Sequence, residues 1–258
     1  MPATRGMAAM TFRRASLAPC LAGVALALIA AAPVAQAASK CPNRLHAKAA
    51  DLSGQMTDKF LKTIKASGVS TIARYYDYPD ETLPGKTLTQ AERDLVAARG
   101  MSLVVIFQHH NDQFTSFTPA RGDGDAVRAL ELAARFGQPK GSAIYFGVDG
   151  DWESDAEQAT ILAYFQAAHA RVAPAGYRVG VYGSGLTCKT LKAAGMASLC
   201  WLPGVNGLEG LDWALSNDAW GLWQQKQSLC GGIDIDLDRI NRWRPDVGQF
   251  TPRPRGAP

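Results

Sequence analysis

Short strand-like runs alternate with helical runs along most of this 258-residue chain. The clearest strand is Leu103–Phe107, a continuous apolar run typical of a strand that is buried on both faces. Eight strands alternating with helices predict one α/β domain, a single (β/α)8 TIM-like barrel with a short or irregular sixth helix. An open doubly wound sheet is the competing fold, but the first strand is not followed by a glycine-rich phosphate loop. The strands are expected at 48–53, 71–76, 103–107, 142–149, 178–182, 198–202, 220–225 and 233–237.

The two ends of the chain differ in composition from the barrel. An apolar run, Leu17–Val34, follows Arg13-Arg14 and ends at Ala35-Gln36-Ala37, a small-residue cleavage pattern. This pattern predicts a signal peptide over 1–37 and export to the periplasm or the outside, by the Sec or the twin-arginine route. The barrel is expected over 38–242, and a proline-rich, disordered tail over 243–258.

Charge and cysteine content limit the possible partners. Removing the three arginines of the signal peptide lowers the formal charge from +4 to +1, so we expect no nucleic-acid partner. We also expect no stable membrane anchor after cleavage of the signal. The mature chain keeps four cysteines without zinc-finger spacing, which favours two disulfides over a metal site. Three pairings are possible. Because a closed barrel places the first strand beside the eighth, our hypothesis is Cys41–Cys230 and Cys188–Cys200.

Acidic residues follow the fourth strand. Ile144, Phe146 and Val148 alternate with Tyr145, Gly147 and Asp149, so Asp149 points into the barrel if the apolar trio packs against helices. Asp151 and Glu153 come directly after it. Carboxylates so close together are able to supply the acid and the base of sugar chemistry, although an acidic loop that caps the next helix is the alternative.

Polar or aromatic residues end nearly all of the strands, at the carboxyl ends where a barrel carries its chemistry. The expected catalytic residues are therefore Asp149, Asp151, Asp51, Asp234 and Glu153. The expected substrate-binding residues are Tyr76, Gln108, His109, Tyr182, Trp201, Gln224 and Asp236.

Two other interpretations of these residues are open. Asp234 or Asp236 would instead be a structural partner of Arg74 or Arg178. The His109-His110 pair would serve a metal-dependent deacetylase, but adjacent strand residues point in opposite directions. We therefore expect no metal and no cofactor.

Several tracts occur in a familiar order, among them Ala143–Asp149, Gly176–Ser184 and Trp220–Gln224. Together they resemble the glycoside hydrolase-like domain family of exported bacterial proteins, domain of unknown function 1906, over about Asp51 to Ile240. That family is similar to the family 25 lysozyme-type muramidases, TIM-like barrels that cleave peptidoglycan.

The resemblance implies a role for each carboxylate. Asp51 matches the aspartate that ends the first muramidase strand, and Asp149 matches the first residue of the Asp-x-Glu motif. Asp151 stands where that motif has its catalytic Glu, so the proton donor would be one methylene shorter. Asp234 or Asp236 matches the late-strand aspartate.

These observations predict an exported hydrolase of O-glycosyl bonds whose partner is cell-wall glycan or another polysaccharide. Asp151 or Glu153 would be the general acid and Asp149 its partner. The alternative is a carbohydrate-binding or envelope-remodelling barrel with weak or absent catalysis.

Overall fold

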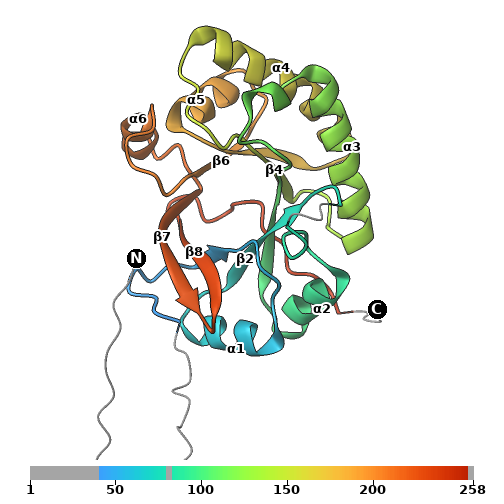
Figure 1. Ribbon diagram of the computed structural model, residues 1–258, viewed down its shortest axis with the longest axis vertical. Helices are drawn as coiled ribbons and strands as arrows, with labels where there is room; N and C mark the ends of the chain where they lie inside the picture. Colours follow the sequence, from blue (N-terminus) through green and yellow to red (C-terminus); the bar gives the residue numbers. More distant parts are fainter. Residues whose placement is uncertain (1–40, 80–82, 255–258) are drawn as a thin grey trace, which may run out of the picture. The chain divides into compact units, whose positions relative to one another are not determined.

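The computed structural model describes residues 41–79 and 83–254, and the expected signal peptide lies outside these ranges. Eight strands form a closed barrel in the order β1 to β8 (Figure 1). The strands are β1 (Ala49–Asp51), β2 (Thr71–Tyr76), β3 (Ser102–Phe107), β4 (Ala143–Gly147), β5 (Arg178–Tyr182), β6 (Leu199–Leu202), β7 (Leu222–Cys230) and β8 (Ile233–Ile240). The expected TIM-like α/β barrel is therefore confirmed.

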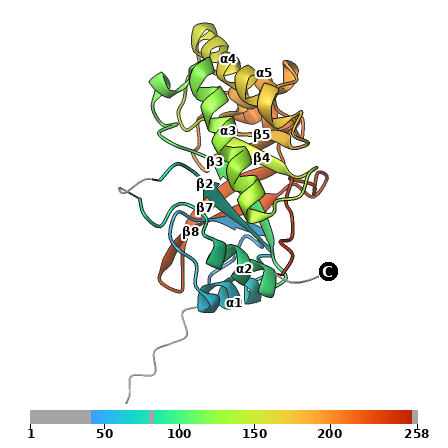
Figure 2. The ribbon, with the colours of Figure 1, turned by 90° about the vertical axis from the view of Figure 1, so that its right-hand side faces the viewer.

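Helices connect the strands up to β7 and cover the outside of the barrel (Figures 1 and 2). A capping box joins Thr89 and Glu92 at the start of α2, and a second joins Ser154 and Glu157 at the start of α4. The helices are α1 (Asp58–Ala66), α2 (Gln90–Ala98), α3 (Pro119–Phe136), α4 (Asp155–Val172), α5 (Gly185–Ala193) and α6 (Leu211–Ser216), with a short 3-10 turn, η1 (Phe114–Ser116). Within the described ranges, no helix is long and apolar enough to cross a membrane.

The last strand departs from the alternating pattern. β8 runs antiparallel to both β7 and β1, whereas the other neighbouring strands are parallel. Its direction follows from the turn before it, where Gly231 and Gly232 both have positive φ, at 62° and 85°. Two such residues make a tight hairpin and leave no room for a helix. The last residue of β1, Asp51, therefore lies opposite Asp236, in the first half of β8.

The barrel interior combines small and large side chains. Ala49, Ala73 and Ala143 leave room for the rings of Tyr145 and Trp201, which meet edge to face at 5.8 Å. A larger apolar layer fills the space between the strands and the helices. The barrel interior is thus a packed core.

The segment after residue 242 is not a disordered tail over its described part. Val247 and Phe250 are buried, and the hydroxyl of Tyr145 donates to the carbonyl oxygen of Val247 over 2.9 Å. Phe250 also forms two backbone hydrogen bonds with Leu103, at the start of β3. This segment closes the barrel from the amino ends of the strands. Residues 255–258 lie outside the described ranges.

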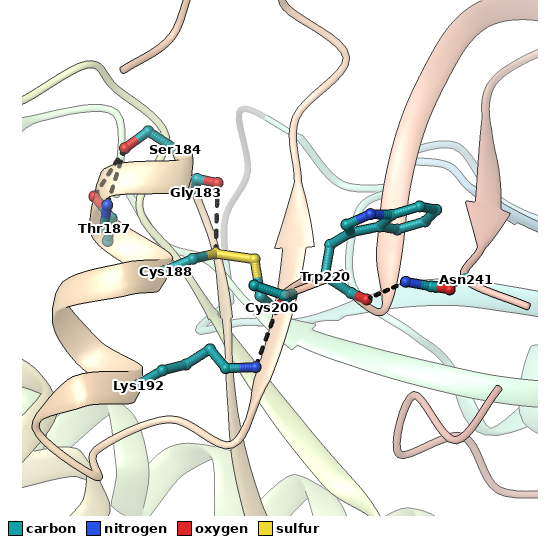
Figure 3. The surroundings of a disulfide bond; sticks show 9 residues. Gly183, Ser184, Thr187, Cys188, Lys192, Cys200, Trp220 and Asn241 are labelled. Atoms are coloured by element: carbon teal, nitrogen blue, oxygen red, sulfur yellow. Dashed lines mark hydrogen bonds between the residues drawn. A yellow bond between two sulfur atoms is a disulfide. The ribbon is translucent and has the colours of Figure 1, made fainter. Parts of the chain in front are cut away.

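Both expected disulfides are present. Cys41 joins Cys230 and ties the segment before β1 to the β7–β8 hairpin. Cys188 of α5 joins Cys200 of β6, and the nearby Lys192 donates to the carbonyl oxygen of Ala219 (Figure 3). The two bonds close loops of very different length, with sequence separations of 189 and 12 residues.

Candidate functional site

The carboxyl end of the barrel is hollow between β1, β2, β4 and the β7–β8 hairpin. A pocket of about 580 Å³ lies against the hairpin and is lined by Asp51, Tyr75, Asp234 and Asp236, among others. A neighbouring pocket of about 330 Å³ is lined by Asp149. Tyr75 lines both pockets. We call the two pockets together the mouth.

Asp51 is the last residue of β1, and its side chain is 2% exposed. Gln224 of β7 donates from Nε2 to its Oδ2 over 2.8 Å, and the hydroxyl of Tyr75 lies 3.4 Å from its Oδ1. Burial raises the pKa of Asp51 to about 7, and the carboxylate of Asp236 contributes to the rise. Asp51 therefore keeps its proton up to a much higher pH than an ordinary carboxyl group does.

Asp149 follows β4 and, unlike Asp51, has an exposed side chain. Gln108 donates from Nε2 to Asp149 Oδ2 over 3.0 Å, and the backbone N–H of Asp149 donates to the carbonyl oxygen of Asn111. Loss of water around the carboxyl group raises the pKa of Asp149, and the hydrogen bond from Gln108 opposes the rise. Strand alternation thus predicted the direction of this side chain correctly.

Tyr75 lines both pockets of the mouth, the one that contains Asp51 and the one that contains Asp149. Lys86 lies over its ring at 5.1 Å and donates to the carbonyl oxygen of Gln108 over 2.6 Å. Burial raises the pKa of the Tyr75 hydroxyl, and the charges of Asp51 and Asp149 add to the effect. The ring is an aromatic surface of the kind on which a sugar packs.

Tyr76, expected to bind substrate, faces away from the mouth. Its side chain is 0% exposed, and its hydroxyl donates to Gln138 Oε1 over 3.1 Å. Because neighbouring strand residues point to opposite faces, Tyr76 packs against the helices while Tyr75 reaches the mouth. The expectation was wrong by one residue.

His109 and Trp201 have structural partners. His109 Nδ1 lies 2.7 Å from Asp77 Oδ1, and Lys86 forms an ion pair with the other oxygen of Asp77 at 3.1 Å. Trp201 is buried inside the barrel and donates from Nε1 to Asp238 Oδ1 over 2.9 Å. Direct contact of Trp201 with a ligand is therefore not supported.

Asp151 and Glu153 lie on the loop between β4 and α4, and both side chains are exposed. The charge of Asp151 raises the pKa of Glu153. The pockets that form the mouth are lined by Asp149 but not by Asp151 or Glu153.

The remaining expected residues surround the mouth. The hydroxyl of Tyr182 donates to Gln224 Oε1 over 3.1 Å, which orients the amide toward Asp51. Burial, and then the charge of Asp234, raise the pKa of Asp236. Neither aspartate is the partner of Arg74 or Arg178, because Arg74 pairs with Glu92 and Arg178 with Asp246.

Two residues of the site were not on the expected list. Tyr75 is the neighbour of Tyr76, which was expected to bind substrate in its place. Asp238 continues the alternation of Asp234 and Asp236 along β8, and that period of two was the signal for it. In the described part of the chain, no group of three or more His, Cys, Asp or Glu side chains is placed to hold a metal ion.

Comparison with known proteins identifies the family. The profile of the Rv2525c-like, glycoside hydrolase-like domain matches residues 62–243. The chain belongs to the Rv2525c-like family of glycoside hydrolase-like domains. The resemblance found from the sequence is thereby confirmed.

Relatives of this Rv2525c-like chain include YbfG of Bacillus subtilis strain 168, which is 29% identical over 209 residues. That match covers 74% of this chain but only 28% of YbfG. The crystal structure of the Tat-secreted protein Rv2525c of Mycobacterium tuberculosis has a TM-score of 0.66 at 22% identity, over 79% of this chain and 98% of Rv2525c.

A second similar structure is that of the modular autolysin LytC from Streptococcus pneumoniae in complex with a synthetic peptidoglycan ligand. Its TM-score is 0.54 at 18% identity, over 74% of this chain and 46% of LytC. At these identities, both structures support the barrel fold and nothing finer.

Proposed function

We propose that this protein is an exported glycoside hydrolase that cleaves bacterial cell-wall glycan. The observation that carries the proposal is the pair Asp51 and Asp149, which line the two pockets of the mouth, with Tyr75 lining both. The family and the peptidoglycan ligand in the LytC structure support the substrate class. Most glycoside hydrolases use two carboxyl groups in different environments as their catalytic residues.

The surroundings of the two carboxyl groups favour a different catalytic role for each. Asp51 is buried and has a pKa raised to about 7, so it suits the general acid that protonates the leaving oxygen. Asp149 is exposed and receives a hydrogen bond from Gln108, so it suits the base or the carboxylate that stabilises positive charge. This assignment replaces Asp151 and Glu153 as the acid, since both are exposed on the loop.

Export is supported by two observations. The chain forms two disulfides, which persist in oxidising compartments, and its relative Rv2525c is a Tat-secreted protein. The expected signal peptide over 1–37 agrees with both, and the route is either Sec or twin-arginine.

A binding barrel without turnover is the second candidate. It is favoured by Asp151, which is shorter than the Glu of the muramidase motif and lies on an exposed loop. A binding function would use Tyr75 and the mouth without proton transfer.

One assay separates the two functions. Purified protein is incubated with peptidoglycan and with soluble chitin-type oligomers, and new reducing ends are measured for wild type, Asp149→Asn and Asp151→Asn. The hydrolase proposal predicts that wild type releases reducing ends. The rate of release should fall by at least about 100-fold in Asp149→Asn, which is the usual contribution of a general acid or base. It should change by less than about tenfold in Asp151→Asn. No release by wild type, together with sedimentation on insoluble glycan, would support the binding function.

A further inference from the structure

Asp238 is a buried carboxyl group that the proposed chemistry does not yet use. It lies on β8 inside the barrel, and its side chain is 0% exposed. Trp201 donates to its Oδ1 over 2.9 Å. Among the described residues, no hydrogen-bond donor reaches its other oxygen, Oδ2. A buried carboxylate oxygen without a donor is costly, so a proton on this group or on a neighbour is expected.

The neighbour that meets this need is Asp51. The β1–β8 register places Asp51 opposite Asp236 and Ala49 opposite Asp238, so Asp51 and Asp238 are diagonal neighbours across the two strands. Gln224 lies opposite Asp238 in the β7–β8 pair and donates to Asp51. The two carboxyl groups also act on each other directly, because a hydrogen bond between their side chains affects the pKa of both.

Little positive charge is available to compensate two ionised carboxylates. Arg74, the cation whose charge acts on Asp51, is committed to Glu92 at 3.0 Å and to the carbonyl oxygen of Leu52 at 2.6 Å. Lys86 and His110 line the pocket beside Asp149, and Lys86 forms an ion pair with Asp77. The other titratable groups that act with Asp51 or Asp238 are acids and phenols, which disfavour a second negative charge. They are Asp236, Tyr75, Tyr182 and Tyr145.

We propose that Asp238 is a positioning residue that shares one proton with Asp51 and so keeps Asp51 ready to donate it. The inference rests on the proposed hydrolase function. The pair carries one negative charge in the resting protein. Cleavage breaks the bond between the sugar carbon and the leaving oxygen, and the proton of Asp51 moves to that oxygen. Water then supplies its hydroxyl to the sugar carbon, and its remaining proton restores the pair through the solvent.

The test is a titration of aspartate carboxyl carbons by NMR in the purified protein without substrate. Wild type is expected to show coupled titration of Asp51 and Asp238, with one midpoint near pH 7. Asp238→Asn keeps an oxygen for Trp201 and removes the shared proton. The Asp51 midpoint should then move by at least about one pH unit and lose its coupling to a second carboxyl group, because the hydrogen bond from Asp238 acts on the pKa of Asp51. Asp246→Asn, which changes an exposed partner of Arg178, is the matched control and should leave the midpoint in place.

A kinetic readout accompanies the titration. In Asp238→Asn, the upper limit of the pH range of reducing-end release should move with the Asp51 midpoint, in the same direction and by a similar amount. At pH 7 kcat should fall by at least about tenfold, with KM changed less than about threefold. A structural role alone would lower activity at all pH values without moving the profile.

The outcomes are separable. An unchanged Asp51 midpoint in folded Asp238→Asn overturns the proton-sharing inference, whether or not glycan is cleaved. Absence of turnover in wild type overturns the hydrolase function, while the titration still tests the pair. If Asp238→Asn does not fold, Asp51→Asn replaces it. Burial raises the pKa of Asp238, and since the charge of Asp51 and its hydrogen bond add to the rise, the midpoint of Asp238 must then fall.

Discussion

Gln224 donates a hydrogen bond to Asp51 over 2.8 Å, although 173 residues separate them in the chain. The same amide accepts hydrogen bonds at Oε1 from the Tyr182 hydroxyl and from the backbone N–H of Gly204. These two donors fix which end of the amide faces Asp51. β7 thereby orients the carboxyl group that β1 supplies.

Replacement of this amide tests its role. Gln224→Leu removes the donor and leaves one oxygen of a buried carboxyl group unpaired, so we expect reducing-end release to fall by at least about tenfold. The matched control is Gln113→Leu, a change at an exposed position, which should leave release within about twofold. Equal activity of Gln224→Leu and Gln113→Leu would contradict the orienting role.

Neighbouring tyrosines on β2 give a second test. Tyr75→Ala removes the ring that lines both pockets of the mouth, so glycan affinity in a sedimentation assay should fall by at least about tenfold. Tyr76→Phe removes only the hydroxyl that donates to Gln138. It should leave affinity unchanged and lower the free energy of unfolding by about 1 kcal/mol. Loss of glycan affinity in Tyr76→Phe but not in Tyr75→Ala would contradict the binding of glycan in the mouth.

Loop length predicts how the two disulfides differ. Replacing Cys41 and Cys230 by Ser opens a loop of 189 residues, and replacing Cys188 and Cys200 opens one of 12 residues. From loop entropy we expect losses in the free energy of unfolding of about 5 and about 3 kcal/mol respectively. Guanidinium chloride unfolding of the two double variants measures this. A larger loss for the shorter loop would contradict the entropic account.

Stability should depend on pH through Asp51. Its pKa rises from 3.8 to about 7 on folding, so between these values the native state binds a proton that the unfolded state has lost. The free energy of unfolding therefore falls as pH rises from about 4 to about 7. Asp51→Asn should flatten this fall by about 1 kcal/mol or more, measured by guanidinium chloride unfolding at pH 4.5 and 8. A wild-type protein that gains stability over this range, with an equal slope in the variant, would exclude the buried acid as the cause.

Much of the fold followed from local pattern. The β-formers of Thr71–Tyr76 and the apolar run of β3 gave strands whose bounds the structure repeats to within one residue. The capping box at Thr89 and Glu92 marked the start of α2. The direction of β8 was not anticipated, although Gly231-Gly232 is a hairpin signal, because a count of eight strands was interpreted as eight parallel ones.

Within the site, period-two alternation predicted the direction of Asp149 correctly. The same alternation explains two errors, the choice of Tyr76 in place of Tyr75 and the omission of Asp238. The face to which β2 turns its side chains is set by packing, so Tyr75 and Tyr76 were exchanged. Asp238 was overlooked because the antiparallel direction of β8 decides which of its aspartates lies deepest. Burial of Val247 and Phe250 depends on contacts with β3 and β4, which the proline-rich composition of that segment does not show.

The most direct test of the central claim is a crystal structure of Asp149→Asn with a peptidoglycan-derived tetrasaccharide. We predict that the sugar chain lies in the mouth on the ring of Tyr75, with a glycosidic oxygen within about 3.2 Å of a carboxyl oxygen of Asp51. A tetrasaccharide bound elsewhere on the barrel, or in the mouth with every glycosidic oxygen out of reach of Asp51, would contradict the account.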